Sequence, residues 1–173
     1  MMRRPLALRV RPAGTMGQHI TFESHVPAAQ RSALEALVFF NSCQERVADC
    51  IASAVEEFGS PEIVSDRTRL RIRIGDLHDV QTLFAIEGDR GRPVGVAVYT
   101  RPGLQHITVL HLGILPEYAS GGRRAGEQLL LRLLREVKRS TRHMKGVRRL
   151  ELYYIKDRTS TTRWREARKA AVV

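Results

Sequence analysis

Cysteines, long apolar runs and acids near the N-terminus are scarce in this sequence, and each shortage excludes a class of protein. Cys43 and Cys50 are the two cysteines, and we expect buried thiols on one helix face rather than a disulfide or a metal pair. No apolar run is long enough to cross a bilayer, so we expect no membrane partner. Arg9 and Arg11 interrupt the first apolar residues too early for a signal peptide. We therefore expect a cytoplasmic protein.

Sequence motifs for common active sites are also missing. The chain has no paired-cysteine motif, no H-E-x-x-H and no G-x-S-x-G, so metal and hydrolase sites have no support. Residues 1–17 contain no acid and are expected to form a flexible basic arm, with a transit-type targeting segment as the alternative. Residues 18–173 are long enough for one globular domain, and 43% of the whole chain is hydrophobic.

Positive charge is confined to the last third of the chain. Residues 1–117 contain 13 basic and 13 acidic residues, whereas residues 118–173 contain 16 basic and 5 acidic ones. The net charge of +11 therefore belongs entirely to residues 118–173. A charge concentrated in this way predicts a face that meets something anionic, such as nucleic acid, a phosphorylated cofactor or an acidic protein.

Hydrophobic periodicity predicts an α/β domain with a mixed sheet. Apolar residues at three- and four-residue steps indicate helices over residues 32–58, with a possible break at Asn41 and Ser42. Strict alternation in "RLRIRIGDL" predicts a half-buried strand. Residues 82–100 read as a hairpin around "GDRGRP". The later elements are a long buried strand, a Leu-rich helix, a further strand and a short basic helix; they are expected over residues 106–115, 124–142, 147–155 and 161–171.

A Gly- and Arg-rich loop joins the long strand to the Leu-rich helix. A strand followed by a glycine turn and a helix directs free backbone N–H groups toward an anion. The planar guanidinium group of arginine can donate two hydrogen bonds to one phosphate. Gly121, Gly122, Arg123 and Arg124 therefore make a plausible phosphate cradle; the alternative is a flexible surface turn with solvated arginines. The chain has neither G-x-x-x-x-G-K-[ST] nor G-x-G-x-x-G, which excludes a P-loop and a dinucleotide fingerprint.

The wider context of this loop resembles the GNAT superfamily of acetyl-CoA-dependent N-acetyltransferases. The resemblance covers residues 68–155 and is carried by "RPVGVAVYT" with Gly95, the long strand ending in "PEY", "GEQLLLRLL" and "RRLELYYI". It implies a GNAT-like mixed β-sheet flanked by helices, with acetyl-CoA as cofactor and an amine-bearing substrate of unknown identity. The loop is about two residues longer than the family's [QR]-x-x-G-x-[GA].

The resemblance also implies where the cofactor lies. In that family the backbone of the central strand, which corresponds to residues 112–115 here, polarises the thioester, and the loop amides hold the CoA pyrophosphate. The matching positions here are Ile114, Leu115, Gly121, Gly122, Arg123, Arg124, Ala125, Gly126 and Glu127.

Catalytic residues are less clearly marked. Glu117 is our first candidate for the base, with His111 and Glu151 as alternatives, and Tyr154 or its neighbour Tyr153 is the candidate acid for the thiolate. The family continues past the last strand with a helix and two strands. Only 18 residues follow Ile155, so we expect a truncated C-terminal end without the family's later tyrosine.

Two further expectations follow from the charge and from the truncated end. Arg132, Arg135, Arg139 and Arg142 form a basic stripe on the Leu-rich helix. The alternative function is therefore a catalytically inactive GNAT-like module that binds RNA or another anionic partner; a third possibility is an acetyltransferase with a polyanionic substrate. An uncovered last strand favours a homodimer over a monomer.

Overall fold

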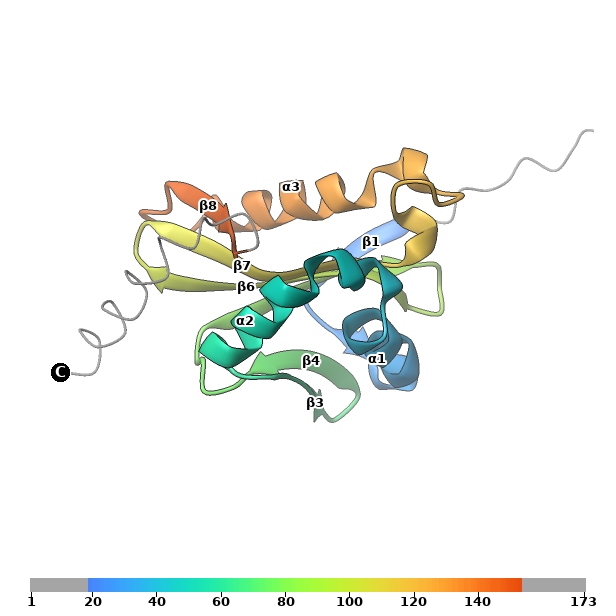
Figure 1. The fold of residues 1–173 in the computed structure, drawn as a ribbon, viewed down its shortest axis with the longest axis horizontal. Helices are drawn as coiled ribbons and strands as arrows, with labels where there is room; N and C mark the ends of the chain where they lie inside the picture. The colour runs from blue at the N-terminus through green and yellow to red at the C-terminus, as the bar shows by residue number, and fades with distance from the viewer. Residues whose placement is uncertain (1–18, 154–173) are drawn as a thin grey trace, which may run out of the picture.

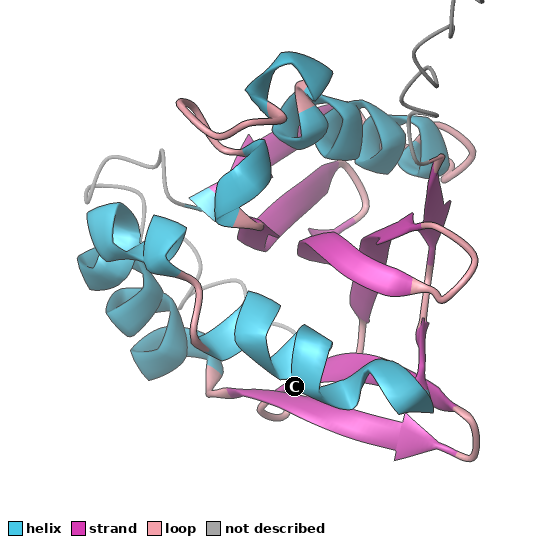
Figure 2. Ribbon diagram, turned by 90° about the vertical axis from the view of Figure 1, so that its right-hand side faces the viewer, coloured by secondary structure: helices cyan, strands magenta, loops and turns pink. Residues whose placement is uncertain are grey.

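The computed structural model describes residues 19–153, which fold into three layers. A five-stranded sheet lies in the middle, one long helix covers one face, and two shorter helices with a small second sheet cover the other (Figures 1 and 2). The arm, the helix expected over residues 161–171, and Tyr154 fall outside the described residues. No helix between residues 19 and 153 has the length and apolar character needed to cross a membrane.

The central sheet is mixed, as the sequence predicted. Its spatial order is β1-β5-β6-β7-β8, with all neighbours antiparallel except β7 and β8, which are parallel. The strands are β1 (Ile20–Glu23), β5 (Val80–Glu87), β6 (Arg92–Gly103), β7 (His106–Ile114) and β8 (Arg149–Leu152). The predicted hairpin is β5 with β6, and the predicted long strand is β7. β8 is shorter than the strand expected over residues 147–155.

The small sheet contains β2 (Val26–Pro27), β4 (Arg69–Ile74) and β3 (Pro61–Asp66), in the order β2-β4-β3. β4 confirms the predicted alternation, because its three apolar side chains are buried and its three arginines are exposed. Sequence reasoning missed β1, β2 and β3. They are short, and β3 is half-buried without a clean alternation of apolar and polar residues.

The predicted break in the first helical region is confirmed. α1 (Arg31–Phe39) and α2 (Ala48–Phe58) are separated by a 3-10 segment, η2 (Ser42–Val47). The Asn41 carboxamide oxygen accepts a hydrogen bond from the Cys43 amide, which caps η2. Cys43 and Cys50 are half-buried free thiols in different elements, not on one helix as expected.

The Leu-rich helix begins later than predicted. α3 spans Leu129–Thr141, whereas the sequence predicted a helix from residue 124. Ala125–Glu127 form a separate 3-10 turn, η4. Gln128 adopts left-handed φ and ψ angles of 50° and 42°, and this residue breaks the helix from the turn.

The sheet separates two hydrophobic cores. One lies under α1, α2 and the small sheet, and the other lies under α3. A Cβ atom at Gly95 would lie 2.8 Å from the Leu133 Cδ1 atom. The glycine in the "RPVGVAVYT" hairpin therefore allows α3 to approach the sheet closely, and this position does not face a substrate.

Candidate functional site

A β-bulge interrupts β7 near its middle. Val98 of β6 pairs with His111, whereas the next residue, Tyr99, pairs with Val109, so Leu110 is an extra residue in β7. Two consecutive residues consequently face the α2 side, because Leu110 and His111 both line one small cavity there.

β7 and β8 separate at this bulge. β8 pairs only with residues 106–109 of β7. Among the described residues, the second half of β7 (residues 110–114) has no strand beside it on the side away from β6. A bulged strand bends and twists, which accounts for the separation. The sheet therefore opens on the C-terminal half of β7, directly before the Gly-Arg loop.

Backbone groups of β7 point into this opening. The Leu115 amide donates to the Val94 carbonyl at 3.0 Å, so Leu115 belongs to the ladder with β6. Because the ladder alternates, the amides of Leu112 and Ile114 face the open side. The Asn41 Nδ2 group donates to the Ile114 carbonyl at 2.7 Å, which anchors that edge. The structure thus keeps Leu112 and Ile114 of the expected strand segment as candidates and shows the Leu115 amide engaged in the sheet.

The Gly-Arg loop satisfies many of its own backbone groups. The amides of Gly122, Arg124 and Ala125 donate to the carbonyls of Ala119, Glu117 and Gly122 at 2.9, 2.8 and 3.1 Å. The amides of Glu127 and Gln128 also donate within the loop. Bonds of this kind leave these amides turned inward and not toward a bound anion.

The first turn of α3 offers a different set of donors. The first helical bond runs from the Arg132 amide to the Gln128 carbonyl at 3.0 Å. The amides of residues 129–131 therefore have no acceptor within the helix, as at any helix start.

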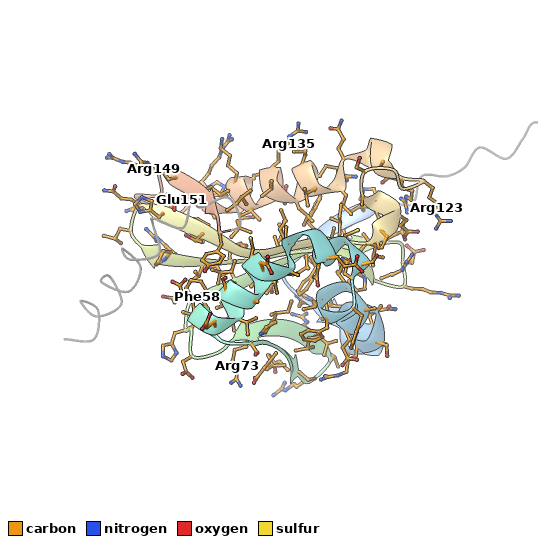
Figure 3. All side chains as sticks on the ribbon, viewed as in Figure 1. Phe58, Arg73, Arg123, Arg135, Arg149 and Glu151 are labelled. Carbon is orange, nitrogen blue, oxygen red and sulfur yellow. The ribbon has the colours of Figure 1, made fainter. Side chains whose placement is uncertain are left out.

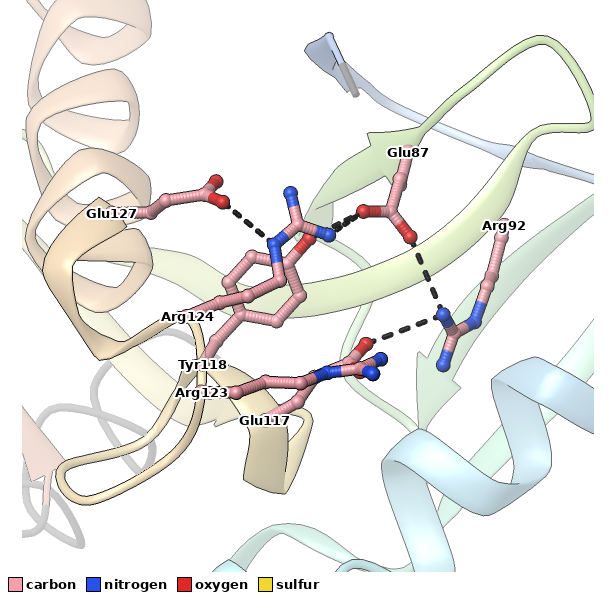
Figure 4. Close-up of polar contacts among 7 residues, drawn as sticks. All are labelled: Glu87, Arg92, Glu117, Tyr118, Arg123, Arg124 and Glu127. Atoms are coloured by element: carbon pink, nitrogen blue, oxygen red, sulfur yellow. Dashed lines mark hydrogen bonds and ion pairs between the residues drawn. The ribbon is translucent and has the colours of Figure 1, made fainter. Parts of the chain in front are cut away.

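Three carboxylates, those of Glu87, Glu117 and Glu127, pair with the two arginines of the loop (Figure 4). The Glu87 side chain, 5% exposed, accepts a hydrogen bond from the Tyr118 hydroxyl at 2.7 Å and pairs with Arg124. The Arg124 guanidinium also pairs with Glu127 at 2.6 Å and lies 4.4 Å from the centre of the Tyr118 ring. Burial raises the pKa of Tyr118 to about 12, with help from the negative charges of Glu127 and Glu117.

Glu117 lies between two further arginines. Its carboxylate pairs with Arg123 at 2.5 Å and with Arg92 at 3.2 Å, and its side chain is 16% exposed. The Arg123 side chain is 77% exposed, in contrast to 18% for Arg124. The predicted site residues Glu117 and Arg123 therefore lie side by side, Arg123 is the more exposed of the two loop arginines, and Glu117 is its counter-ion.

Comparison with known proteins identifies no relative. A scan against protein-family models gives no match, and searches of curated proteins and of solved structures also give none. The function must be inferred from the geometry itself.

A small cavity lies on the α2 side of the bulge. It measures about 40 Å³, is lined mainly by apolar side chains of α2, β4 and β6, and has His111 in its wall. The His111 Nε2 atom lies 3.2 Å from the Gln44 Nε2 atom. Burial lowers the pKa of His111 to about 4, so the ring is neutral at physiological pH.

Tyr153 follows β8 directly, at the point where β8 leaves β7. Its hydroxyl donates to the Glu57 carboxylate at 2.8 Å, and its ring meets Phe58 edge-on with centroids 5.3 Å apart. Burial and the hydrogen bond to Glu57 raise the pKa of Tyr153, so the phenol keeps its proton. Glu151, the third candidate base, lies in β8 opposite Thr108 and therefore before the opening.

A wider groove lies between the end of α1 and α2. It has a volume of about 520 Å³, and the Phe39 and Phe40 side chains in its wall are 42% and 81% exposed. Asn41 and Gln44, which contact β7, also line it, and Glu45 adds a carboxylate. The signal for this groove in the sequence was the Phe-Phe pair at the helix break. Within residues 19–153, no cluster of three His, Cys, Asp or Glu side chains could hold a metal ion.

Proposed function

We propose that this protein is an N-acetyltransferase that moves an acetyl group from acetyl-CoA to an amine, in the manner of the GNAT superfamily it resembles. The observation that carries the proposal is the bulge at Leu110 together with the separation of β7 from β8. This arrangement turns backbone donors of Leu112 and Ile114 into an opening of the sheet. A thioester needs such donors where negative charge develops on its carbonyl oxygen.

The phosphates of the cofactor fit the region just beyond this opening. Arg123 is exposed, and the amides at the start of α3 have no helical acceptor. The loop amides are largely engaged within the loop, so we assign the phosphates to the Arg123 guanidinium and the first turn of α3. Gly121 and Gly126 are exposed in the same loop and add no side chain that would block the approach.

The amine is assigned to the groove with Phe39 and Phe40 in its wall. Asn41 joins that groove to the opening, because it lines the groove and bonds the Ile114 carbonyl. The carboxylate of Glu45 would attract a protonated amine. Tyr153 follows β8 at the point where β8 leaves β7, and its phenol, which donates to Glu57, stays protonated, so we assign it the proton for the leaving thiolate. Tyr154, our first candidate, lies outside the described residues.

Thermal unfolding with acetyl-CoA, CoA and ATP tests the proposal. A ligand at one hundred times its dissociation constant stabilises the folded state by about 2.7 kcal/mol, which is a readily measured shift. We expect acetyl-CoA and CoA to raise the melting temperature. We expect R123E to remove that shift, and R71E, a charge reversal at an exposed position of β4, to retain it. No shift at millimolar acetyl-CoA would rule out the acetyltransferase assignment.

A further inference from the structure

The outer face of α3 and the segment that follows it are strongly basic. Residues 129–149 contain eight Lys and Arg residues and a single acid, Glu136. That acid pairs with Arg139 at 2.5 Å, so both charges of this pair are compensated. The other basic residues of this segment have no acid within residues 129–149 that would offset their charge.

A row of three positive charges lies opposite the buried face of α3. Leu133 and Val137 point into the core, whereas Arg135, Lys138 and Arg142 are exposed at three- and four-residue steps. Among the described residues, none of the three has a carboxylate partner. Seven helical steps separate the first from the last, which is about 10 Å.

The row continues onto the segment before β8. Lys145, Arg148 and Arg149 are exposed, and two backbone contacts fix the chain that carries them. The Arg101 guanidinium donates to the Lys145 carbonyl at 2.6 Å, and the Arg148 amide donates to the Gln105 carbonyl at 2.9 Å. Figure 3 shows Arg135 and Arg149 on the same side of the molecule, the side that carries α3.

We propose that this surface, termed the basic face, binds the phosphate backbone of a nucleic acid. The basic face comprises Arg135, Lys138, Arg142, Lys145, Arg148 and Arg149. A nucleic acid carries a phosphate about every 3.4 Å of each strand, so three cations in about 10 Å match its charge density. Four of the six side chains are arginines, whose forks bind phosphate with two hydrogen bonds.

An acidic protein fits this surface less well. Stable protein interfaces are built around buried aromatic or aliphatic anchors. The exposed large apolar side chains of α3, Leu130 and Leu131, lie at the opposite end of the helix from Arg142. Among the described residues, Leu104 is the one exposed large apolar side chain near Gly146; it lies at the β6–β7 turn.

The basic face is separate from the proposed acetyl-CoA site. Arg123 lies beyond the first turn of α3, at the far end of the molecule from Arg149 (Figure 3). The inference therefore does not depend on the acetyltransferase proposal, and each can fail alone.

Fluorescence anisotropy with a labelled RNA 20-mer and a labelled DNA duplex tests the inference on the full chain. The variant is the triple reversal R135E/K138E/R142E. Its matched control is R69E/R71E/R73E, which makes the same change in net charge on exposed residues of the opposite layer. We expect the first variant to lose at least tenfold in affinity, and the control to lose much less. The slope of log affinity against log salt should fall by about two in the first variant alone.

Three results would overturn the inference. The first is unchanged affinity in R135E/K138E/R142E. The second is an equal loss of affinity in the control, which would show that binding depends only on the net charge of the protein. The third is displacement of the oligonucleotide by polyglutamate as efficiently as by unlabelled RNA, which would point to an acidic protein instead. Circular dichroism and the melting temperature of each variant without ligand confirm that the fold is intact.

Discussion

At the scale of single residues, the partners of a charged side chain decide what it is available to do. Arg123 and Arg124 are neighbours in the sequence with the same chemistry. Arg124 lies over the Tyr118 ring and pairs with buried Glu87, whereas Arg123 is exposed and pairs with Glu117. The Arg123 end of this pair is in solvent and Glu117 has a second partner in Arg92, so a phosphate can take the place of Glu117 at Arg123 while Glu117 remains paired. Arg124 instead holds the loop in place.

Replacing Glu117 by Gln distinguishes a counter-ion from a catalytic base. The carboxylate pairs with both Arg92 and Arg123, so its geometry is that of a counter-ion to these two guanidinium groups. We expect E117Q to bind CoA as tightly as the wild type or up to about fivefold more tightly, because Arg123 is released. Turnover should fall by less than tenfold. A hundredfold fall in kcat with unchanged CoA binding would instead identify Glu117 as the base.

Gly122 and Gly126 look alike in the sequence and differ in the structure. A Cβ atom at Gly122 would lie 2.4 Å from the Glu117 carbonyl oxygen, whereas a Cβ at Gly126 would meet nothing within 4 Å. We expect G122A to lower the free energy of unfolding by about 1–3 kcal/mol, as for other forced contacts, and G126A to change it by less than about 0.5 kcal/mol. Urea unfolding of both variants measures the difference. Equal effects would show that the loop does not pack against residues 116–117 as described.

Because the His111 ring is buried, we expect the protein to lose stability in mild acid. The pKa of His111 is about 4 in the folded protein because the ring is buried, and about 6.5 in an unfolded chain. Between these values the unfolded state binds a proton that the folded state does not, so stability falls as pH drops from 6.5 to 4. The loss between pH 7 and pH 5 is at most about 2 kcal/mol. Urea unfolding at both pH values should show a smaller loss in H111Q than in the wild type, with exposed H78Q as the control. An equal loss in H111Q would contradict the assignment.

At the scale of secondary structure, patterns with a strong period could be predicted and features set by tertiary contacts could not. The alternation in β4 and the apolar runs of the β5–β6 hairpin and β7 follow directly from the sequence. The bulge at Leu110 depends on how β6 and β7 pair, and no residue in "HITVLHLGIL" indicates that a bulge forms there. The opening of the sheet, and with it the choice of Leu112 and Ile114 over Leu115 as candidate donors, therefore required the structure.

The start of α3 shows a second limit of sequence reasoning. The segment from residue 124 has a helical apolar period, but the loop bonds and the ion pair of Arg124 with Glu87 hold residues 124–127 in a separate turn. The helix can resume only after a residue with left-handed φ and ψ angles, and that residue is Gln128. Periodicity does not report such a local backbone reversal.

Replacing Gln128 by glycine should therefore stabilise the protein, whereas glycine at an ordinary helix position destabilises it. A side chain other than glycine in the left-handed region costs about 1 kcal/mol, and glycine removes that cost. We expect Q128G to raise the free energy of unfolding by about 0.5–1 kcal/mol and Q128V to lower it. Leu131 to Gly, at an exposed position inside α3, is the control and should destabilise by about 1 kcal/mol. A loss of stability in Q128G would mean that α3 continues through residue 128 as a regular helix.

At the scale of the whole molecule, the two proposed sites lie at opposite ends of α3. The acetyl-CoA site involves the loop before the helix and the opening in β7, and the basic face occupies the outer side of the helix and the segment leading to β8. Both surfaces proposed to bind anions therefore belong to the layer of α3, whose residues carry part of the positive charge that follows residue 117. The groove proposed for the amine lies in the layer with α1 and α2.

The edge of the central sheet gives the final prediction, a homodimer. β8 is the last strand in the order β1-β5-β6-β7-β8, so one side of it has no partner strand among residues 19–153. Its Leu150 and Leu152 side chains are only half-buried. An edge with unpaired backbone groups and apolar side chains favours pairing with another strand, and a symmetric pair of β8 strands satisfies both copies at once.

Sedimentation equilibrium at micromolar concentration measures the predicted dimer. We expect a species of about twice the 19.6 kDa chain mass that dissociates on dilution. Hydrogen exchange of residues 149–152 should be slow in the dimer and accelerate as it dissociates, because the edge amides are then exposed to water. A clean monomer with those amides still protected would show that another segment of the same chain covers the edge. A monomer with rapid exchange would show that β8 remains an open edge, and the homodimer prediction would be wrong in both cases.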